Sequence, residues 1–344
     1  MTARKLRWGI IGTGKIARTF ARALSSSESG VLVAVASRTP EGAASFSAEF
    51  GGVRAHGSYE ALLADPEVQV VYIATPHPGH AHWSILAARA KKHVLCEKPL
   101  GMNHAEVSAM VQAARENDVF LMEAFMYRCH PQTREVARLI RAGALGRVKA
   151  IQASFGIDGE FPASHRVLNN ELGGGGILDV GCYPVSMARM VAGAANDRAF
   201  DEPLELHAFG HVGEDSRVDE YTTAILKFPG EIVASLATAV KLWQENSVRI
   251  FGSEGRLFLR APWHPGLGGN PSEIVIERGK SEPEVIPVPA SGTLYSYEID
   301  AVVAQLERRE ATEMSWADSL GNARTLDRWR HALGVRYAAD QVEV

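Results

Sequence analysis

The chain has 344 residues, of which 36 are basic, 40 are acidic and 46% are hydrophobic, giving a formal net charge of −4. A chain of this length exceeds what one core normally supports, so we expect two domains with a ligand groove between them. The ordinary globular composition argues against disorder, and the balanced charge without a long basic run argues against nucleic-acid binding.

The cysteines and the amino terminus indicate where the protein works. Cys96, Cys129 and Cys182 are odd in number and lack CxxC spacing, so we expect no disulfide framework, no thiolate zinc site and no other metal. The first residues reach glycine before a long apolar stretch accumulates, unlike a signal peptide or a membrane span. We therefore expect a cytoplasmic protein without a membrane partner.

The amino-terminal part alternates strand and helix patterns. Short continuous apolar runs fit strands that are buried on both faces, and the stretches between them show helical spacing. The predicted strands are 6–11, 31–36, 68–74, 94–96 and 119–123, and the predicted helices include 15–24, 40–50 and 81–90. Such alternation predicts a Rossmann domain, an α/β fold with a doubly wound parallel sheet.

Beyond Ala124 the pattern changes to successive strands with few helices between them. Pro229-Gly230 supplies the turn of a hairpin, and the segment 263–271, rich in turn formers, is expected to be a connecting surface loop in preference to a ligand contact. The predicted strands are 148–155, 204–210, 221–228, 232–239 and 247–251, and the closing helices are 297–306 and 317–330. We predict a dinucleotide-binding domain over 1–123. A substrate-binding and oligomerisation α+β domain with a large mostly antiparallel sheet would span 124–344.

A glycine-rich turn joins the first predicted strand to the first predicted helix. Gly12-Thr13-Gly14-Lys15-Ile16-Ala17 matches GxGxxG/A in the strand–turn–helix context that binds dinucleotides. Small residues let the backbone approach a pyrophosphate, and the helix N-terminus offers unpaired N–H groups to it. We expect cofactor contacts from Gly12, Thr13, Gly14, Lys15 and Ile16, with a purely structural turn as the less favoured alternative.

The end of the second predicted strand indicates which dinucleotide binds. An enzyme selective for NAD usually carries Asp or Glu there, whereas this chain carries Ser37 and Arg38. The arginine fork and the serine hydroxyl suit the 2′-phosphate of NADP. We therefore expect NADP as the cofactor, with NAD as the alternative if Arg38 only stacks on the adenine.

Glu97-Lys98-Pro99 follows a predicted strand at the sheet edge where ligands of doubly wound folds bind. The Lys98 ammonium could stabilise a developing alkoxide or lower the pKa of a neighbouring acid. The alternative is a solvated lysine that pairs with Glu97.

A run of four glycines precedes Asp179 and Tyr183, which share one face if their segment is helical. A phenol can exchange a proton with a carbinol or carbonyl oxygen when positive charge, such as that of Lys98, lowers its pKa. Spacing alone favours a cap and a core aromatic, and Pro184 predicts a kink just after Tyr183.

These motifs, in this order, resemble the Gfo/Idh/MocA family of dehydrogenases over nearly the whole chain. The similarity is strongest to the branch of dimeric dihydrodiol dehydrogenases, NADP-dependent D-xylose dehydrogenases and glucose-fructose oxidoreductase, which carries tyrosine where Tyr183 stands. The resemblance implies catalytic roles for Lys98, Tyr183 and Asp179. It further implies cofactor contacts from Thr75, Pro76, His77, His80, Glu97, Lys98 and Arg128, and substrate contacts from Lys98, Tyr127, Arg166, Asp179 and Tyr183.

The activity implied by the resemblance is hydride transfer between NADP(H) and a secondary alcohol or hemiacetal of a sugar, cyclic polyol or dihydrodiol. Lys98 and Tyr183 would form the proton relay, and the protein would be a homodimer. The alternative is a nicotinamide-assisted glycosidase, which oxidises its sugar, eliminates the aglycone, adds water and reduces again. A non-catalytic NADP sensor is less favoured, because it needs no proton relay.

Overall fold

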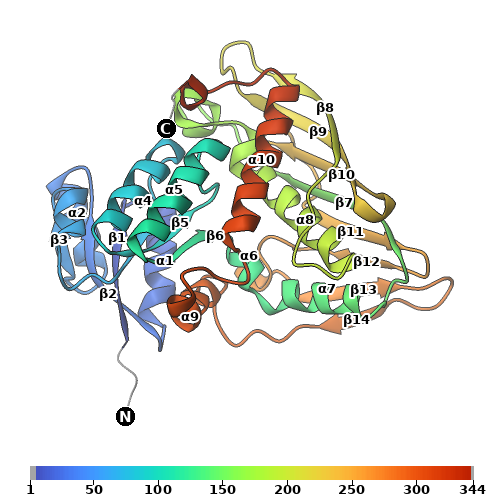
Figure 1. Ribbon diagram of the computed structural model, residues 1–344, viewed down its shortest axis with the longest axis horizontal. Helices are drawn as coiled ribbons and strands as arrows, with labels where there is room; N and C mark the ends of the chain where they lie inside the picture. Colours follow the sequence, from blue (N-terminus) through green and yellow to red (C-terminus); the bar gives the residue numbers. More distant parts are fainter. Residues whose placement is uncertain (1–4, 342–344) are drawn as a thin grey trace. The chain divides into compact units, whose positions relative to one another are not determined.

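The computed structural model describes residues 5–341, which form two compact units (Figure 1). The first contains the described residues up to Met126 together with 292–319, and the second contains 127–291 and the described residues from Leu320 onward. The sequence had assigned everything after residue 123 to the second domain. Over 292–319 the chain belongs to the first unit again, through contacts between residues far apart in the sequence. One of them is the 2.6 Å hydrogen bond from Ser29 Oγ to Asp300 Oδ1, which no local sequence pattern predicts.

The sheet of the first unit consists of six parallel strands in the order β3-β2-β1-β4-β5-β6. They are β1 (Leu6–Ile11), β2 (Gly30–Ala36), β3 (Arg54–His56), β4 (Val70–Ile73), β5 (His93–Glu97) and β6 (Leu121–Ala124). This is the predicted doubly wound sheet. The strand order reverses between β1 and β4, and ligands of such sheets bind beyond the carboxyl ends of the strands at that point.

The helices of the first unit differ at their amino-terminal ends. Its helices are α1 (Lys15–Ser25), α2 (Pro40–Glu49), α3 (Tyr59–Leu63), α4 (His80–Arg89), α5 (His104–Asn117) and α9 (Ser296–Gln305). The side chains of Thr39, Ser58 and Asn103 cap α2, α3 and α5 by accepting hydrogen bonds from backbone N–H groups. Among the described residues, no side chain caps α1, α4 or α9, and of these helices α1 begins at Gly14 of the glycine turn. The first turn of α1 therefore keeps N–H groups available for a ligand.

The second unit contains an eight-stranded sheet in the order β14-β13-β12-β11-β7-β10-β9-β8. Its strands are β7 (Val148–Gly156), β8 (Glu205–Val212), β9 (Asp219–Phe228), β10 (Ile232–Ala239), β11 (Ser247–Gly252), β12 (Arg256–Leu259), β13 (Glu273–Glu277) and β14 (Glu284–Pro287). Only β7 and β10 pair in parallel, so the mostly antiparallel sheet is confirmed. The predicted hairpin is present, because Phe228 of β9 pairs with Ile232 of β10 around Pro229-Gly230.

One face of this sheet carries helices. The helix α8 (Cys182–Ala195) packs on β7 and β10 and is buried along almost its whole length, and α7 (Pro131–Arg141) packs beside α8. A π-helical turn over Ile177–Gly181 leads into α8. The remaining helices are α6 (Met126–Cys129) and α10 (Trp316–Ala332), each of which spans a boundary between the units. No helix among residues 5–341 is long and apolar enough to cross a membrane.

Candidate active site

The glycine turn after β1 has the geometry that a bound pyrophosphate needs. Gly12 has a φ of +99°, and a Cβ there would lie 2.6 Å from the backbone oxygen of Ala74, so the fold itself requires glycine. Gly14 is different, because a Cβ there would meet no protein atom within 4 Å. The open space at Gly14 and the uncapped start of α1 leave room for phosphates beside Lys15 and Ile16.

The loop after β2 presents Ser37 and Arg38 next to this turn. The hydroxyls of Thr13 and Ser37 lie 3.2 Å apart, which places the predicted ribose-side residues beside the glycine turn. Arg38 is exposed and forms no ion pair within residues 5–341. No carboxylate occupies the two positions after β2. A guanidinium in this setting can receive a phosphate group.

The loop after β4 carries Thr75, Pro76, His77 and His80. The Thr75 hydroxyl is buried and has no hydrogen-bond partner among the described residues, so it could receive one from a ligand. The His80 ring is fully buried, with Nδ1 2.8 Å from the Pro99 oxygen and Nε2 3.0 Å from the Thr75 oxygen. His80 thereby ties the loop after β4 to the loop after β5, while Pro76 is exposed and His77 is buried.

The loop after β5 presents Lys98, which is half-buried. The neighbouring Glu97 carboxylate is buried, where it accepts hydrogen bonds from the Tyr72 hydroxyl and from the backbone N–H of Lys98. Burial, followed by the charge of Glu97, raises the pKa of Glu298 well above its usual range, which favours the neutral form of this second acid. The buried Tyr72–Glu97 pair therefore supports the Lys98 loop.

In the second unit, Tyr127 and Arg128 of α6 fix the start of α8. The Arg128 Nη1 donates to Ser186 Oγ at 2.8 Å, and both side chains are buried. The Tyr127 hydroxyl lies 3.4 Å from the backbone oxygen of Tyr183, and the two rings are 5.6 Å apart. The predicted cofactor residue Arg128 and the predicted substrate residue Tyr127 thus both contact the helix that carries Tyr183.

Arg166, Asp179 and Tyr183 lie close together in the second unit. Arg166 Nη1 donates to Asp179 Oδ1 at 2.9 Å, in an ion pair whose arginine is about half exposed and whose aspartate is buried. Such a pair can orient hydroxyl groups of a substrate.

The predicted kink after Tyr183 is wrong. The irregularity instead comes before Tyr183, as the π-helical turn Ile177–Gly181. The physical reason is that Pro184 lacks the N–H that a regular α-helix would direct to the preceding turn.

Sequence reasoning missed an aromatic cluster around Tyr183. The rings of Phe155 and Trp263 lie 5.1 and 5.8 Å from the Tyr183 ring, and Trp263 also packs edge-on against Tyr127. Trp263 is buried and its indole N–H donates to the Ser154 oxygen at 2.9 Å, so the predicted connecting loop begins with a core residue. A tryptophan inside a stretch of turn formers is the sequence signal that could have indicated this.

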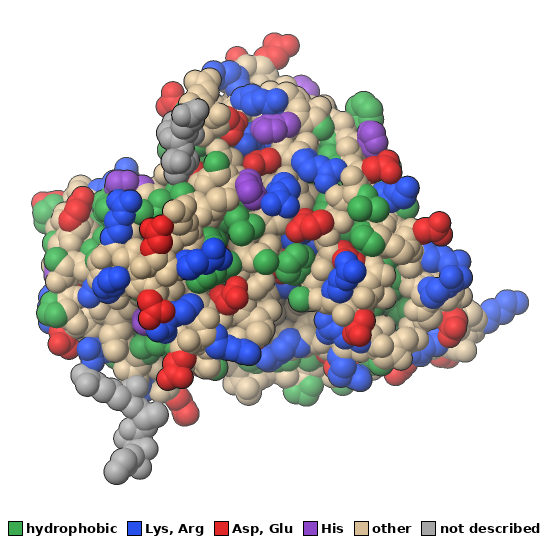
Figure 2. All heavy atoms as spheres, viewed as in Figure 1, with side chains coloured by type: hydrophobic (Ala, Val, Ile, Leu, Met, Phe, Trp, Pro, Cys, Tyr) green, Lys and Arg blue, Asp and Glu red, His purple; other side chains and the backbone are tan. Residues whose placement is uncertain are grey.

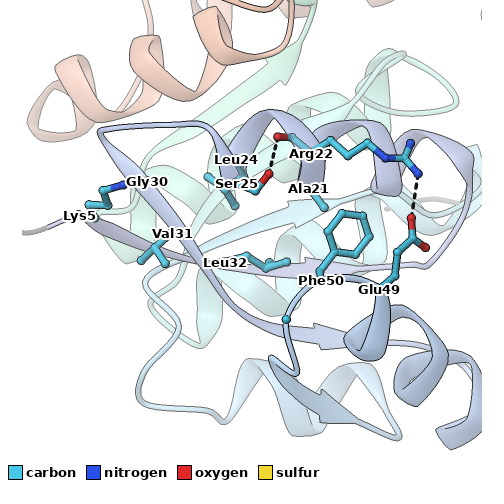
Figure 3. Close-up of a pocket in the computed structure, with 11 residues that line it drawn as sticks. Lys5, Ala21, Arg22, Leu24, Ser25, Gly30, Val31, Leu32, Glu49 and Phe50 are labelled. Atoms are coloured by element: carbon cyan, nitrogen blue, oxygen red, sulfur yellow. Dashed lines mark hydrogen bonds and ion pairs between the residues drawn. The ribbon is translucent and has the colours of Figure 1, made fainter.

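The first unit also has a cavity away from the predicted site residues. A cavity of about 560 Å³ lies in the first unit beside α1 and β2, where Figure 3 shows Arg22 paired with Glu49, and no predicted site residue lines it. On the face seen in Figure 2, basic and acidic side chains are interspersed. Among residues 5–341 there is no group of three or more His, Cys, Asp or Glu side chains arranged to hold a metal ion.

Two protein-family models match the chain. One, described as the oxidoreductase family with an NAD-binding Rossmann fold, matches residues 6–125, and the GFO/IDH/MocA C-terminal domain matches residues 133–258. A trans-1,2-dihydrobenzene-1,2-diol dehydrogenase from Danio rerio is 37% identical, over 97% of this chain and 99% of its own. The enzyme of that name from Homo sapiens is 33% identical, over 98% and 99%.

Solved structures agree with the sequence matches. An aldose-aldose oxidoreductase from Caulobacter crescentus, complexed with glycerol, superposes with a TM-score of 0.86 at 26% identity, over 97% of this chain and 99% of that chain. A 3-ketoreductase from Actinomadura kijaniata, in complex with NADP and TDP-benzene, superposes with a TM-score of 0.83 at 29% identity, over 96% and 98%. These likenesses extend over both units of the fold.

Proposed function

Because the chain belongs to the Gfo/Idh/MocA family of NAD(P)-binding oxidoreductases, we propose that it transfers a hydride between NADP(H) and a secondary alcohol or hemiacetal. The substrate class is a sugar, a cyclic polyol or a dihydrodiol. The observation that carries the proposal is the glycine turn at Gly12 and Gly14, where the start of α1 has no side-chain cap and room for a pyrophosphate. The names of the relatives support the substrate class.

In the proposed oxidation, the carbinol carbon gives up a hydride, the carbinol oxygen gives up a proton, and a carbon–oxygen double bond forms. The nicotinamide supplies the hydride acceptor. Tyr183 takes the proton, and the Lys98 ammonium favours the phenolate and stabilises charge on the oxygen. Asp179 and Arg166, paired at 2.9 Å, hold the substrate hydroxyls. Reduction follows the same steps in reverse.

The proposed preference for NADP rests on the loop after β2. Arg38 is exposed and Ser37 lies beside Thr13, so a guanidinium and hydroxyls surround the place where the adenosine ribose would bind. Thr75, Pro76, His77 and His80 would face the nicotinamide side, and Glu97 and Arg128 would support it. NAD remains the second cofactor, since stacking of Arg38 on the adenine would serve both.

The aromatic cluster supports Tyr183. The rings of Tyr127, Phe155 and Trp263 are buried against the Tyr183 ring and hold it in place. The Arg166–Asp179 pair would address the hydroxyls of the substrate. The names of the relatives support small cyclic substrates over linear ones.

The outer face of the eight-stranded sheet supports a homodimer. Alternate residues of β8 to β10 point outward, and several of them are apolar and exposed, with Phe209 at 84% and Ile225 at 54% exposure. Exposed apolar residues gathered on one sheet face mark an interaction surface. Light scattering should show that Phe209→Glu with Ile225→Glu halves the molar mass, whereas Val31→Glu on β2 of the first unit, where Val31 is also exposed, leaves it unchanged. Equal masses for all three proteins would contradict the dimer.

The direct test follows nicotinamide absorbance with purified protein, offering NADP and NAD separately against aldoses, cyclic polyols, trans-dihydrodiols and glycosides. We expect reduction of NADP with an aldose or a diol. Lys98→Met should lose most of this turnover while keeping NADP affinity, because Lys98 acts on the reacting oxygen. Glycoside cleavage without net reduction would favour the redox-assisted glycosidase, and binding of NADP without any turnover would favour a sensor.

A further inference from the structure

Asp219, the first residue of β9, is a buried carboxyl that no step above uses. Its side chain has no exposed surface, and its Oδ2 accepts a hydrogen bond from the backbone N–H of Ile177 at 2.7 Å. Ile177 opens the π-helical turn that leads to Asp179 and Tyr183. The carboxyl therefore lies at the amino-terminal end of the segment that carries both proposed active-site residues.

The glycine run before Ile177 is shaped around this carboxyl. A Cβ at Gly175 would lie 2.4 Å from Asp219 Oδ1, and Gly175 has a φ of +104°, so only glycine fits there. Two further side chains fix the same run, since the Tyr337 hydroxyl donates to the Gly174 oxygen at 2.6 Å and the Thr238 hydroxyl donates to the Gly176 oxygen at 3.1 Å. Side chains from three distant parts of the chain thus converge on four consecutive residues.

The Asp219 carboxyl gains or loses its proton near neutral pH. Burial raises its pKa to about 7, although hydrogen bonds from the backbone N–H groups of Ile177 and Gly176 lower it in part. Tyr337 is the titratable group that interacts with it electrostatically, and burial, followed by Asp219, raises the pKa of that phenol well above its usual range. Tyr337 therefore stays neutral, and the raised pKa of Asp219 means that the closed segment favours the neutral carboxyl over the ionised one.

We infer that Asp219 is a positioning residue for the proposed reaction: it holds the Gly174–Ile177 segment in place and thereby sets where Asp179 and Tyr183 stand. The inference rests on the proposed function for its consequence in catalysis. A small displacement of a proton-transfer group lowers the reaction rate, because the reacting atoms must be held at near-attack separation. Glycine at position 175 thus serves to admit the Asp219 carboxyl.

The test compares Asp219→Asn with Asp201→Asn. Asp201 is also buried, and it accepts hydrogen bonds from Asn196 and Arg198 beyond the other end of α8, so it controls for loss of a buried carboxylate. Hydrogen exchange of residues 174–183, measured by mass spectrometry, should quicken about tenfold or more in Asp219→Asn and remain unchanged in Asp201→Asn. In the wild-type protein, exchange corrected for its intrinsic pH dependence should quicken as pH rises from about 4 to 7, because opening exposes Asp219 and lets it ionise, and Asp219→Asn should lack this step.

Activity provides the second readout. With NADP and the substrate that gives wild-type turnover, Asp219→Asn should lower kcat about tenfold or more while leaving NADP affinity unchanged. Tyr337→Phe, which removes the hydrogen bond to Gly174 and retains Asp219, should give the same pattern more weakly and serves if Asp219→Asn does not fold.

Unchanged exchange in Asp219→Asn, equal loosening in Asp201→Asn, or loosening without a fall in kcat would overturn the inference. Absence of wild-type turnover would contradict the proposed function alone, since the exchange comparison needs no substrate and would still decide whether Asp219 holds the segment.

Discussion

The candidate residues of the two units are held in different ways. In the first unit, Gly12, Thr75 and Lys98 each lie within two residues of the end of a strand of the parallel sheet, so pairing between neighbouring strands fixes them. In the second unit, Asp179 and Tyr183 lie at a helix start that Asp219 and Tyr337 reach from distant parts of the chain. Backbone pairing holds the first set of residues, which limits the effect of side-chain substitutions elsewhere. Side chains from distant parts of the chain hold the second set, so substitutions of those side chains should be transmitted to it.

The largest expected effect lies in the second unit. Tyr183→Phe should lower kcat/KM by about 10² to 10⁴, because it removes the group that accepts the proton. NADP affinity should be unchanged, since the cofactor turn belongs to the first unit. Steady-state rates with NADP, together with a fluorescence titration of the cofactor, measure both quantities. Turnover at the wild-type level would show that another group moves the proton.

A matched pair of glycine substitutions separates packing from cofactor binding in the first unit. Gly12→Ala should lower the free energy of unfolding by about 2 to 4 kcal/mol, because its Cβ would collide with the Ala74 oxygen at a positive φ. Gly14→Ala should change that free energy by less than about 0.5 kcal/mol, because its Cβ would meet no protein atom within 4 Å.

The effect of Gly14→Ala should appear instead as weaker NADP binding, by about tenfold, since the methyl group would occupy the space of the pyrophosphate. Denaturant titrations and cofactor titrations of both variants give the comparison. Full NADP affinity in a stable Gly14→Ala protein would remove the observation on which the proposed function rests.

Acid should weaken the second unit through His130. This ring is buried at the start of α7, where its Nδ1 accepts a hydrogen bond from the Gln132 N–H at 3.1 Å, and burial followed by Arg134 lowers its pKa to about 4. Its stabilising contribution is therefore complete above pH 6.5 and is lost as pH falls toward 4.

The variant His130→Asn keeps a capping side chain but cannot titrate. Between pH 6.5 and 4, the wild-type protein should lose about 3 kcal/mol of unfolding free energy relative to His130→Asn. Denaturant titrations of both proteins at several pH values measure this loss. A constant difference would mean that the ring titrates normally.

A further comparison concerns cofactor choice in the first unit. Arg38→Ala should weaken NADP binding by about 1.5 to 3 kcal/mol, the usual contribution of a hydrogen bond to a charged group. NAD binding should change little, because NAD lacks the 2′-phosphate. Titrations of wild type and variant with each cofactor measure the ratio of NADP affinity to NAD affinity. An equal loss of affinity for both cofactors would mean that Arg38 contacts the adenine.

The first unit could be predicted closely from the sequence because its signals are contiguous. The apolar run of β1, the glycine turn and the helix α1 follow one another, and the missing acidic residue at Ser37-Arg38 is visible without any structure. Each depends on local chain geometry, which a short window of sequence contains.

The second unit could be predicted only in outline. Five strands, including the hairpin at Pro229-Gly230, followed from alternation, but the short strands β12, β13 and β14 carried too weak a pattern. The start of the π-helical turn is hydrogen-bonded to Asp219 and Thr238 of distant strands, and the position of Trp263 depends on tertiary packing. Long-range contacts of this kind leave no local period in the sequence.

The most direct test of the account follows the hydrogen itself. A substrate deuterated at the carbinol carbon, chosen as the one that reduces NADP, is mixed with wild-type protein and with Tyr183→Phe, and cofactor and product are analysed by mass spectrometry. Hydride transfer assisted by Tyr183 predicts deuterium in NADPH in step with carbonyl product, at a far lower rate in the variant. Product that forms while the cofactor stays unlabelled, or equal rates in both proteins, would contradict hydride transfer assisted by Tyr183.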